Sequence, residues 1–345
     1  MPAVKFGLMI PTPTQPIDEV FKHTRLAEKN GFDSIWIADH LVMMRPGFVP
    51  DAWSVLSAIS MITKDMMLGT CVSDPHRRHP AVFAQILATI DRISNGRVAL
   101  GMGPGESMNV KAFGIDFERP VAKMTESVEI IRRLLNEKKV TYDGDFFELK
   151  DAFLQVKPVG KVPFYIGSNS PKTRRLTGRI GDGWMPFLET PDTYRDHLKD
   201  VHVGTEEANR DLTEIDTSLL LSTAISGDKK EAFDCVNPYR VNYATMPDKV
   251  RAAYPNLKFP EVSHDLLSSS TPESLAGLAR FAASIPKDAV YDFNVVGTLE
   301  DCMKQIERYI RSGVNHFILV NRGPDHEKIL ETYGKKIIPY FKQEF

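Results

Sequence analysis

Short segments rich in β-branched and aromatic residues alternate along most of the chain with amphipathic segments of helical period. This alternation is typical of successive βα units around a parallel sheet. Eight such strands predict an α/β protein with a closed (β/α)8 barrel, the TIM-barrel fold. The predicted strands are Lys5–Ile10, Ser34–Ala38, Met67–Ser73, Val98–Met102, Phe164–Gly167, Trp184–Phe187, Ser218–Ile225 and His316–Val320.

The segments between these strands carry the end signals of helices. Three of them close with Asn-Gly or Ser-Gly just past the last apolar residue, a combination that ends helices because glycine accepts the left-handed conformation. The predicted helices are Ile17–Asn30, Ala52–Thr63, Pro80–Ile93, Val121–Glu137, Pro171–Ile180 and Leu299–Ser312.

Two stretches interrupt this alternation. Residues 140–156 contain an Asp-Gly turn between β-rich runs and predict a hairpin. Residues 237–286 are rich in proline and predict an extra helical segment over one mouth of the barrel. Active sites of such barrels lie at the carboxyl ends of the strands, where insertions usually shape a pocket. We therefore expect a single domain over residues 1–345 with two insertions.

Composition narrows the classes of partner. The chain is 42% hydrophobic and 26% charged, and 43 basic and 45 acidic residues give a formal net charge of -2. This balance provides no electrostatic footprint for nucleic acid or an anionic membrane, and no apolar run approaches the roughly 20 residues of a membrane span. Cys71, Cys235 and Cys302 form no CxxC pair, which favours a reducing compartment. We expect a cytoplasmic protein with a small-molecule substrate.

The second predicted strand ends in Trp36-Ile37-Ala38-Asp39-His40, which places an acid and a histidine at the barrel mouth. A histidine at a strand end can transfer a proton or polarise a substrate oxygen. It can equally be a hydrogen-bonded residue that only anchors a loop, and position alone favours neither reading.

The third strand leaves the barrel through Asp74-Pro75-His76-Arg77-Arg78-His79-Pro80. His76 and His79 could be read as a metal pair, but no third ligand follows at a familiar spacing and the two arginines would repel a cation. We therefore expect no metal site here, and we interpret the histidines as loop anchors or as groups that face a phosphate.

The fourth strand continues into Gly101-Met102-Gly103-Pro104-Gly105-Glu106-Ser107-Met108-Asn109. Its glycines allow a ligand close to the backbone, but the run is not GxGxxG and no acidic residue follows at Rossmann spacing, so a nicotinamide fold is disfavoured. Glu106 is predicted to stand at the mouth beside His40, pairing a carboxylate with an imidazole. A solvated turn carboxylate is the alternative.

The fifth strand ends at Gly167-Ser168-Asn169-Ser170, and Pro171-Lys172-Thr173 then opens a helix. Small residues, a hydroxyl cap and a nearby lysine form an anion site, because the free N–H groups and the helix dipole point at the ligand. This pattern indicates a phosphorylated cofactor, although any well-capped helix looks similar.

At these residues the chain resembles the luciferase-like flavin and deazaflavin oxidoreductases, over nearly its whole length. The resemblance rests on four motifs that occur in the order and spacing of that family. They are Trp-Ile-Ala-Asp-His, Arg-His-Pro-Ala-Val-Phe-Ala-Gln, Asn-Gly-Arg-Val-Ala-Leu-Gly-Met-Gly-Pro-Gly-Glu and Gly-Arg-Ile-Gly-Asp-Gly-Trp. Within the family the chain is most similar to the branch that uses the deazaflavin coenzyme F420, which includes secondary-alcohol and glucose-6-phosphate dehydrogenases and methylenetetrahydromethanopterin reductase.

The resemblance implies roles for individual residues. His40 and Glu106 would be the catalytic, proton-handling pair. The residues implied to contact the deazaflavin ring and ribityl chain are Asp39, Cys71, Val72, Glu106 and Asn109, and those implied to hold the phosphate are Gly167, Ser168 and Asn169. A cis peptide between Cys71 and Val72 and a homodimer are also implied.

Two departures leave the substrate open. Dehydrogenases of this branch carry a glutamate just after the first strand, where this chain has Pro11-Thr12-Pro13-Thr14-Gln15, and a tryptophan where it has Met44. Met43 and Met44 suggest an apolar, adaptable wall, or ordinary packing. The predicted function is therefore hydride transfer between F420 and an alcohol, sugar phosphate or methylene-tetrahydropterin. The alternatives are an FMN-dependent monooxygenase on the same fold and a non-catalytic flavin-binding protein.

Overall fold

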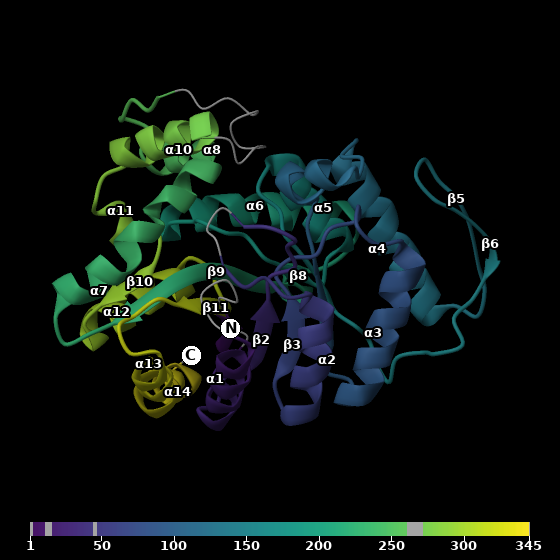
Figure 1. Ribbon diagram of the computed structural model, residues 1–345, viewed down its shortest axis with the longest axis horizontal. Coiled ribbons are helices and arrows are strands. Elements are labelled where there is room, and N and C mark those ends of the chain that lie inside the picture. Colours follow the sequence, from purple (N-terminus) through teal and green to yellow (C-terminus); the bar gives the residue numbers. More distant parts are fainter. Residues whose placement is uncertain (1–2, 11–15, 44–46, 261–271, 345) are drawn as a thin grey trace.

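The computed structural model describes residues 3–10, 16–43, 47–260 and 272–344, and its main sheet closes into a barrel of eight parallel strands (Figure 1). In barrel order the strands are β1 (Lys5–Ile10), β2 (Ser34–Ile37), β3 (Met67–Thr70), β4 (Val98–Met102), β7 (Phe164–Ile166), β8 (Gly183–Trp184), β9 (Asp216–Ile225) and β11 (His316–Asn321). Pairing of β11 with β1 completes the ring. The predicted (β/α)8 barrel, the TIM-barrel fold, is confirmed.

Three predicted strands differ from the structure by two residues or more, and one observed strand is not predicted. Strand β3 ends at Thr70 and not at Ser73, which forms only an isolated bridge to Met102, and β9 begins at Asp216 and not at Ser218.

Strand β8 is only two residues long, because the chain leaves the sheet after Trp184 and returns as an isolated bridge between Phe187 and Leu220. A short strand that the sequence does not predict, β10 (Val295–Gly297), pairs in parallel with the carboxyl end of β9. Its three residues are all buried, so they show no alternation of polar and apolar positions.

Helices cover the outside of the barrel, and the six predicted ones have ends within one residue of those expected. Side-chain caps explain where several begin, since Asp51 accepts from the backbone of Ser54, while Ser170 and Thr298 each form a capping box with the third helical residue. These helices are α1 (Ile17–Lys29), α2 (Ala52–Ile62), α3 (Pro80–Ser94), α4 (Pro120–Asn136), α5 (Pro171–Ile180) and α12 (Leu299–Arg311).

The sequence misses a long helix, α6 (Pro191–Glu207), which packs along α5. Its buried face combines Tyr194 and Val201 with Pro191, Gly204 and Thr205, so the apolar period is incomplete. Shorter unpredicted helices are α7 (Lys229–Val236), α11 (Ala289–Asp292), α13 (His326–Thr332) and α14 (Ile338–Glu344), and short turns of helix are η2 (Ser107–Asn109), η3 (Lys111–Phe113), η4 (Leu212–Glu214) and η6 (Tyr333–Ile337). No helix in the described ranges is long and apolar enough to cross a membrane.

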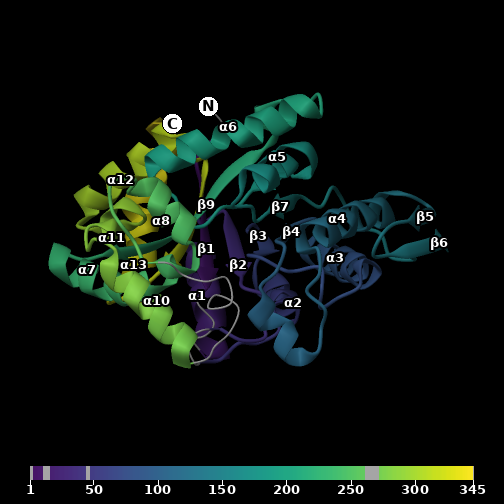
Figure 2. The same ribbon diagram turned by 90° about the horizontal axis from the view of Figure 1, so that it is seen from above.

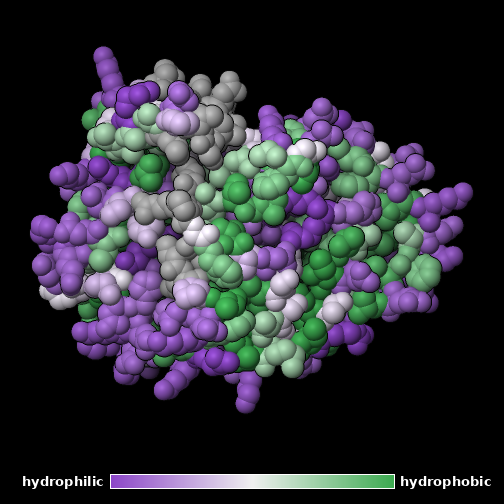
Figure 3. All heavy atoms as spheres, in the orientation of Figure 1, coloured by the Kyte–Doolittle hydropathy of each residue, from purple (hydrophilic) through white to green (hydrophobic). Residues whose placement is uncertain are grey.

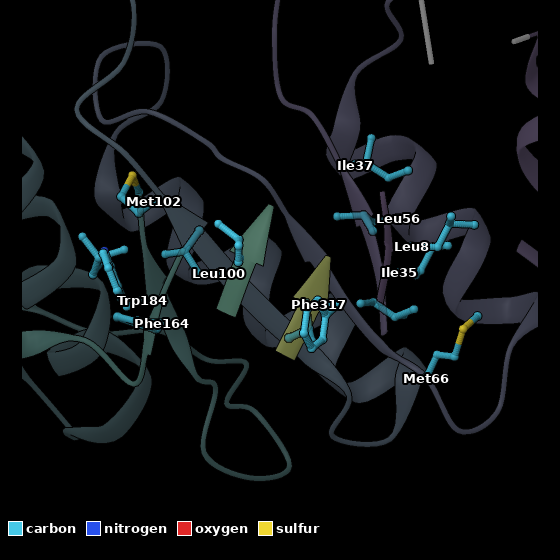
Figure 4. Packing of buried hydrophobic residues seen from close by; sticks show 14 of the residues in the cluster. Leu8, Ile35, Ile37, Leu56, Met66, Leu100, Met102, Phe164, Trp184 and Phe317 are labelled. Carbon is cyan, nitrogen blue, oxygen red and sulfur yellow. The ribbon is translucent and has the colours of Figure 1, made fainter. Parts of the chain in front are cut away.

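Alternation along each strand divides the core into two layers. Outward side chains such as Leu8 and Ile35 pack against the helices, and Figure 4 shows them beside Leu56 of α2, with Phe164 next to Trp184 across the barrel. Inward side chains fill the barrel and form a separate cluster of Met9, Trp36, Ala38, Cys71, Ala99, Tyr165, Met185, Ile318 and Val320. The mouth therefore opens above a filled barrel and not above a pore.

The amino-terminal end of the barrel interior is polar and closed. Ser34 Oγ receives a hydrogen bond from Trp36 Nε1 at 2.8 Å and contacts His316 Nε2 at 2.8 Å. The carboxylate of Asp216 accepts from Tyr165 at 2.6 Å and lies 3.2 Å from His316 Nδ1. Burial alone would raise the pKa of Asp216, but His316 and the other donors hold it well below its ordinary value. These groups bond to one another through Ser34 Oγ and Asp216 Oδ2, while the buried Asp216 Oδ1 has no hydrogen-bond partner among the described residues. The mouth lies at the opposite end of the barrel.

The structure has a hairpin within residues 140–156 and helices within residues 237–286, of which residues 261–271 lie outside the described ranges. The hairpin consists of β5 (Val140–Asp143) and β6 (Glu148–Ala152), which pair antiparallel and project from the side of the barrel (Figure 1). The second insertion contains η5 (Asn237–Thr245), α8 (Pro247–Ala253) and α10 (Pro272–Ser284), and Figure 2 shows α8 and α10 on the same side of the molecule. A hydrophobic cluster joins this segment to Leu188, just after β8, so the insertion packs at the carboxyl ends of the strands.

Candidate active site

The floor of the barrel mouth is apolar and is built from small residues. The peptide between Cys71 and Val72 is cis, as the resemblance implies, and the side chain of Val72 lies over two glycines at neighbouring strand ends. A Cβ at Gly103 would come within 2.6 Å of Val72 Cγ2, and one at Gly167 within 3.3 Å of Val72 Cγ1. Burial raises the pKa of the Cys71 thiol to about 12, so this cysteine is a neutral part of the floor.

Asp39 is buried at the end of β2 and is held by partners that the sequence analysis does not identify. Its carboxylate accepts from Ser73 Oγ at 2.6 Å and pairs with Arg77 at 3.1 Å and Arg78 at 2.8 Å. Arg78 also pairs with Asp51, the cap of α2. This network fixes the loop after β3, and it leaves Asp39 with its side chain 1% exposed. The adjacent arginines in the sequence are the signal that could have revealed it.

The structure brings His40, Glu106 and Asn109 together from the carboxyl ends of β2 and β4, which flank β3 in the barrel. Asn109 Nδ2 lies 2.9 Å from His40 Nδ1 and 3.3 Å from Glu106 Oε2, and His40 Nδ1 lies 3.8 Å from the same carboxylate oxygen. Asn109 is buried, whereas the side chains of His40 and Glu106 are 21% and 55% exposed. A buried amide therefore connects an imidazole and a carboxylate that both reach solvent at the mouth.

The turn that presents Glu106 depends on a glycine. Gly105 has a φ of 86°, and a Cβ there would lie 3.0 Å from Asp74 and 3.2 Å from His76. His76 in turn contacts the carbonyl of Pro104 at 3.0 Å, and His79 caps α3 by accepting from Ala81 N. Both histidines thus have the loop-anchoring role that the sequence favours over metal binding.

The segment after β7 has the geometry expected of a helix start, and its Ser168 hydroxyl is already bonded within the protein. Ser170 Oγ accepts from Thr173 N, and Thr173 Oγ1 accepts from Ser170 N, which closes the capping box of α5. Ser168 is buried and bonds to Thr177 at 2.8 Å. Pro171 has no N–H, so the N–H of Lys172 is the first-turn donor for which neither the helix nor this cap supplies an acceptor.

Asn169 is exposed, but its carbonyl is turned inward to Arg174. Arg174 Nη1 donates to Asn169 O at 2.6 Å, and the same guanidinium is paired with Asp200 of α6 at 2.8 Å. Arg174 is buried, so α6 supports the conformation of the loop from Gly167 to Ser170 through this ion pair. The sequence gives no indication of this support, because it does not predict α6.

A buried ion cluster attaches the second insertion to the mouth. Lys249 Nζ of α8 lies 2.7 Å from Glu189 Oε1 and donates to Phe187 O at 2.6 Å, while Thr193 and His197 of α6 bond to the Glu189 carboxylate at 2.7 and 3.0 Å. Burial alone would raise the pKa of Glu189, but Lys249 and His197 outweigh it and lower the pKa to about 2. Glu189 therefore stays ionised, and its charge is satisfied entirely within the protein.

Two features that bear on the substrate lie outside the described residues, namely Met44 of the predicted wall and the segment Pro11–Gln15, which stands where dehydrogenases of this branch carry a glutamate. Met43 is half-buried beside the mouth loop that follows His40. Within the described ranges, no group of three or more His, Cys, Asp or Glu side chains is placed to hold a metal ion.

Comparison with known proteins places this site in a family. Residues 4–316 match the family described as luciferase-like monooxygenase. A 5,10-methylenetetrahydromethanopterin reductase of Methanolobus tindarius is 31% identical over 338 residues, which cover 96% of this chain and 99% of the relative. An F420-dependent glucose-6-phosphate dehydrogenase of Microbacterium testaceum is 29% identical over 351 residues, covering 99% of this chain and 98% of the relative.

A solved structure shows the same relationship. An F420-dependent secondary alcohol dehydrogenase, in complex with an F420-acetone adduct, matches with a TM-score of 0.83 at 27% identity, and the match covers 97% of this chain and 98% of that one. The sequence relatives and the structural relative are all oxidoreductases by name, and they agree along almost the full length of the barrel. The chain therefore belongs to the luciferase-like monooxygenase family, in its branch of F420-dependent oxidoreductases.

Proposed function

We propose that this chain binds coenzyme F420 at the barrel mouth and transfers a hydride between it and a small organic substrate. The observation that carries the proposal is the cluster of His40, Asn109 and Glu106 beside the apolar floor of Val72, in a chain about as similar to a reductase as to a dehydrogenase of the F420-dependent branch. Fold alone would not carry it, because barrels of this kind host many chemistries.

The residues at the mouth fit such a cofactor. Gly103 and Gly167 leave room for the side chain of Val72, since a Cβ at either position would press on it, and a flat ring would lie against this valine. The N–H of Lys172 and the dipole of α5 favour a phosphate near Gly167, Ser168 and Asn169. Cys71, Val72, Glu106 and Asn109 would border the ring, and Asp39 would shape its pocket through the loop after β3.

When bound, F420 supplies or accepts the hydride, and the protein provides orientation and proton handling. His40 is placed to exchange a proton or hydrogen bond with the reacting heteroatom of the substrate, because it is the imidazole that reaches the mouth. Glu106, 3.8 Å from His40, is placed to respond to charge that develops in the cofactor ring.

The function is tested by a substrate screen with oxidised and with reduced F420. Alcohols, sugar phosphates and methylene-tetrahydropterins are supplied in separate assays, and the absorbance of the cofactor is followed. We expect one class to give a change that requires the protein and consumes cofactor and substrate in equal amounts. Absence of any protein-dependent change in both directions, with F420 shown to be bound, would contradict hydride transfer to these classes.

The second candidate is an FMN-dependent monooxygenase, which is favoured by the description of the matching family. A deazaflavin lacks the ring nitrogen used in oxygen chemistry, so the two candidates differ in their dependence on oxygen. Oxygen consumption with reduced FMN and a purified yellow protein would support the second candidate. Turnover with F420 that is unaffected by removal of oxygen would exclude it.

The loop from Gly167 to Ser170, where we propose that the phosphate binds, gives a prediction about the affinity for F420. In Gly167→Val the new side chain would crowd Val72 from a Cβ 3.3 Å away, and overpacking of this kind costs about 1–3 kcal/mol. We therefore expect F420 to bind roughly tenfold more weakly, as measured by fluorescence titration. Lys172→Ala should have a smaller effect that disappears at high salt.

The matched control is Gly160→Val, because a Cβ at Gly160 would have no neighbour within 4 Å. This variant should bind F420 as the unmodified protein does. Equal affinity of Gly167→Val and Gly160→Val would place the phosphate elsewhere.

We also infer a homo-oligomer, most simply a dimer, that uses the face formed by α2 and α3. Figure 3 shows apolar side chains gathered on this part of the surface, and Met61 of α2 is 73% exposed while Val82 and Ile93 of α3 are 47% and 45% exposed. Sedimentation equilibrium should give the mass of two chains, and Met61→Lys should shift it toward one. A single-chain mass at all concentrations would contradict the inference.

A further inference from the structure

The orientation of the Asn109 side chain is fixed by the backbone of the loop after His40. The N–H groups of Leu41 and Val42 both point at Asn109 Oδ1, at 2.7 and 3.0 Å. Only an oxygen can accept from two backbone donors, so this atom must be the carbonyl oxygen of the amide. The opposite orientation of the amide would place an NH2 group against two N–H groups and lose both bonds.

The amide nitrogen of Asn109 consequently faces the catalytic pair. It lies 2.9 Å from His40 Nδ1 and 3.3 Å from Glu106 Oε2, so each of its two hydrogens has an acceptor. All hydrogen-bonding positions of this buried amide are then used, two by backbone donors and two by the pair. An amide NH2 cannot accept a hydrogen bond, which means that His40 Nδ1 must accept.

We propose that Asn109 is a positioning residue that holds His40 as the neutral tautomer with its proton on Nε2. A neutral imidazole carries one proton, and a proton on Nδ1 would face the NH2 of Asn109 and break the 2.9 Å contact. Nε2 is the remaining ring nitrogen, so the resting site offers the substrate an N–H donor and not a lone pair.

This arrangement deepens the proposed function and rests on it for its chemical meaning. A donor at Nε2 suits a substrate whose reacting heteroatom is a hydrogen-bond acceptor, such as a carbonyl oxygen or an imine nitrogen. The hydride would come from reduced F420, whose C–H bond breaks as the coenzyme is oxidised. As the new C–H bond forms on the substrate, the π electrons of its double bond move to the heteroatom, where the Nε2–H hydrogen bond stabilises the growing negative charge. Glu106 supports the tautomer indirectly, because it accepts the second hydrogen of the Asn109 amide and so holds that amide in place.

The tautomer can be measured without cofactor or substrate. The protein is labelled with 15N-histidine, and long-range 1H–15N correlation spectra are recorded at about pH 8, where an ordinary imidazole is neutral. The chain has 9 histidines, and loss of one pattern in His40→Gln assigns its signals. We expect His40 to show a protonated Nε2 and an unprotonated Nδ1. A proton on Nδ1 in the unmodified protein would overturn the proposal by itself.

The variant Asn109→Asp tests whether the amide of Asn109 fixes the tautomer of His40. An aspartate at this position can accept from Nδ1 but cannot donate to it, so the pattern of His40 should invert or become that of the doubly protonated ring. Asn136→Asp is the control, because Asn136 is exposed on α4 and its side chain donates to the helix backbone at Arg132 O. It should leave the His40 pattern unchanged. An unchanged pattern in Asn109→Asp would also overturn the proposal.

These spectra separate the proposal from the proposed function. If the tautomer is as expected but no F420-dependent turnover is found, the proposed function fails while the role of Asn109 stands. If turnover is found, Asn109→Asp should lower it by roughly tenfold or more while F420 remains bound. Full turnover in Asn109→Asp, with an inverted tautomer, would show that the tautomer does not matter for the reaction.

Discussion

Replacement of Glu106 by glutamine is expected to lower turnover by roughly a hundredfold or more while F420 still binds, the usual scale for losing a general acid or base. Glutamine keeps the shape and an acceptor for Asn109 Nδ2 but loses the charge and the ability to carry a proton 3.8 Å from His40. His40→Asn should lower turnover to a similar extent and also change its dependence on pH, because asparagine cannot titrate. Steady-state rates over a range of pH, together with F420 titrations, measure both effects.

Two exposed residues of the same types provide the controls. Glu148 lies on the hairpin and His202 lies on α6, both away from the strand ends. The variants Glu148→Gln and His202→Asn should therefore retain the rate of the unmodified protein. If Glu106→Gln and His40→Asn also retained it with a confirmed substrate, the pair would be structural and the catalytic assignment would be wrong.

Lys249→Met is expected to destabilise the protein by about 3–5 kcal/mol, because it leaves the buried carboxylate of Glu189 without its nearest cation. The side chains of Lys249 and Glu189 are only 6% and 0% exposed, so water cannot replace the lost partner. His197 remains 3.0 Å away and should keep the loss from being larger. The free energy of unfolding in urea is the measurement, and the loss should be greatest at neutral pH, where Glu189 is ionised.

The controls for this prediction separate burial from charge. Lys304→Met removes the lysine of an exposed pair with Glu300, whose side chains are 69% and 79% exposed, and should change stability by less than about 0.5 kcal/mol. The double variant Lys249→Met with Glu189→Gln should be more stable than Lys249→Met alone, since no buried charge is left. Equal stability of Lys249→Met and Lys304→Met would contradict the buried ion pair.

Local pattern explains why much of the barrel could be predicted. Strands β1 and β4 have the predicted bounds because their residues alternate between the helix layer and the barrel interior, and helix α5 has the predicted bounds because Ser170 and Pro171 mark its start. Strand β10 and helix α6 could not be predicted in the same way. The first is too short to show a period, and the second buries a face that contains few apolar residues.

The positions of the candidate site residues could be predicted, but their hydrogen-bond partners could not. Strand-end position alone places His40 and Glu106 at one mouth, and the resemblance adds the roles of Val72 and Asn109. Neither source reveals what each side chain is bonded to. The side-chain oxygen of Asn109 accepts from the backbone N–H groups of Leu41 and Val42. These bonds depend on the path of a loop that is 68 residues away in sequence.

The burial of Lys249 and its pairing with Glu189 also could not be predicted from the sequence. Lys249 stands between aspartate and valine in an unremarkable helical segment, and its partner Glu189 is 60 residues away. A solvated lysine is the ordinary expectation for such a position. Its burial follows only from the way α8 packs on the loop after β8, which is a property of the tertiary structure.

An equilibrium titration of the purified apoprotein with F420 and with FMN decides which cofactor the barrel mouth binds. Binding is followed by the change in cofactor fluorescence, with Gly167→Val and Gly160→Val measured in parallel. We expect saturable binding of F420, much weaker binding of FMN, and a loss of F420 affinity in Gly167→Val alone. Tight binding of FMN with no saturable binding of F420 would show that this chain is not an F420-dependent enzyme.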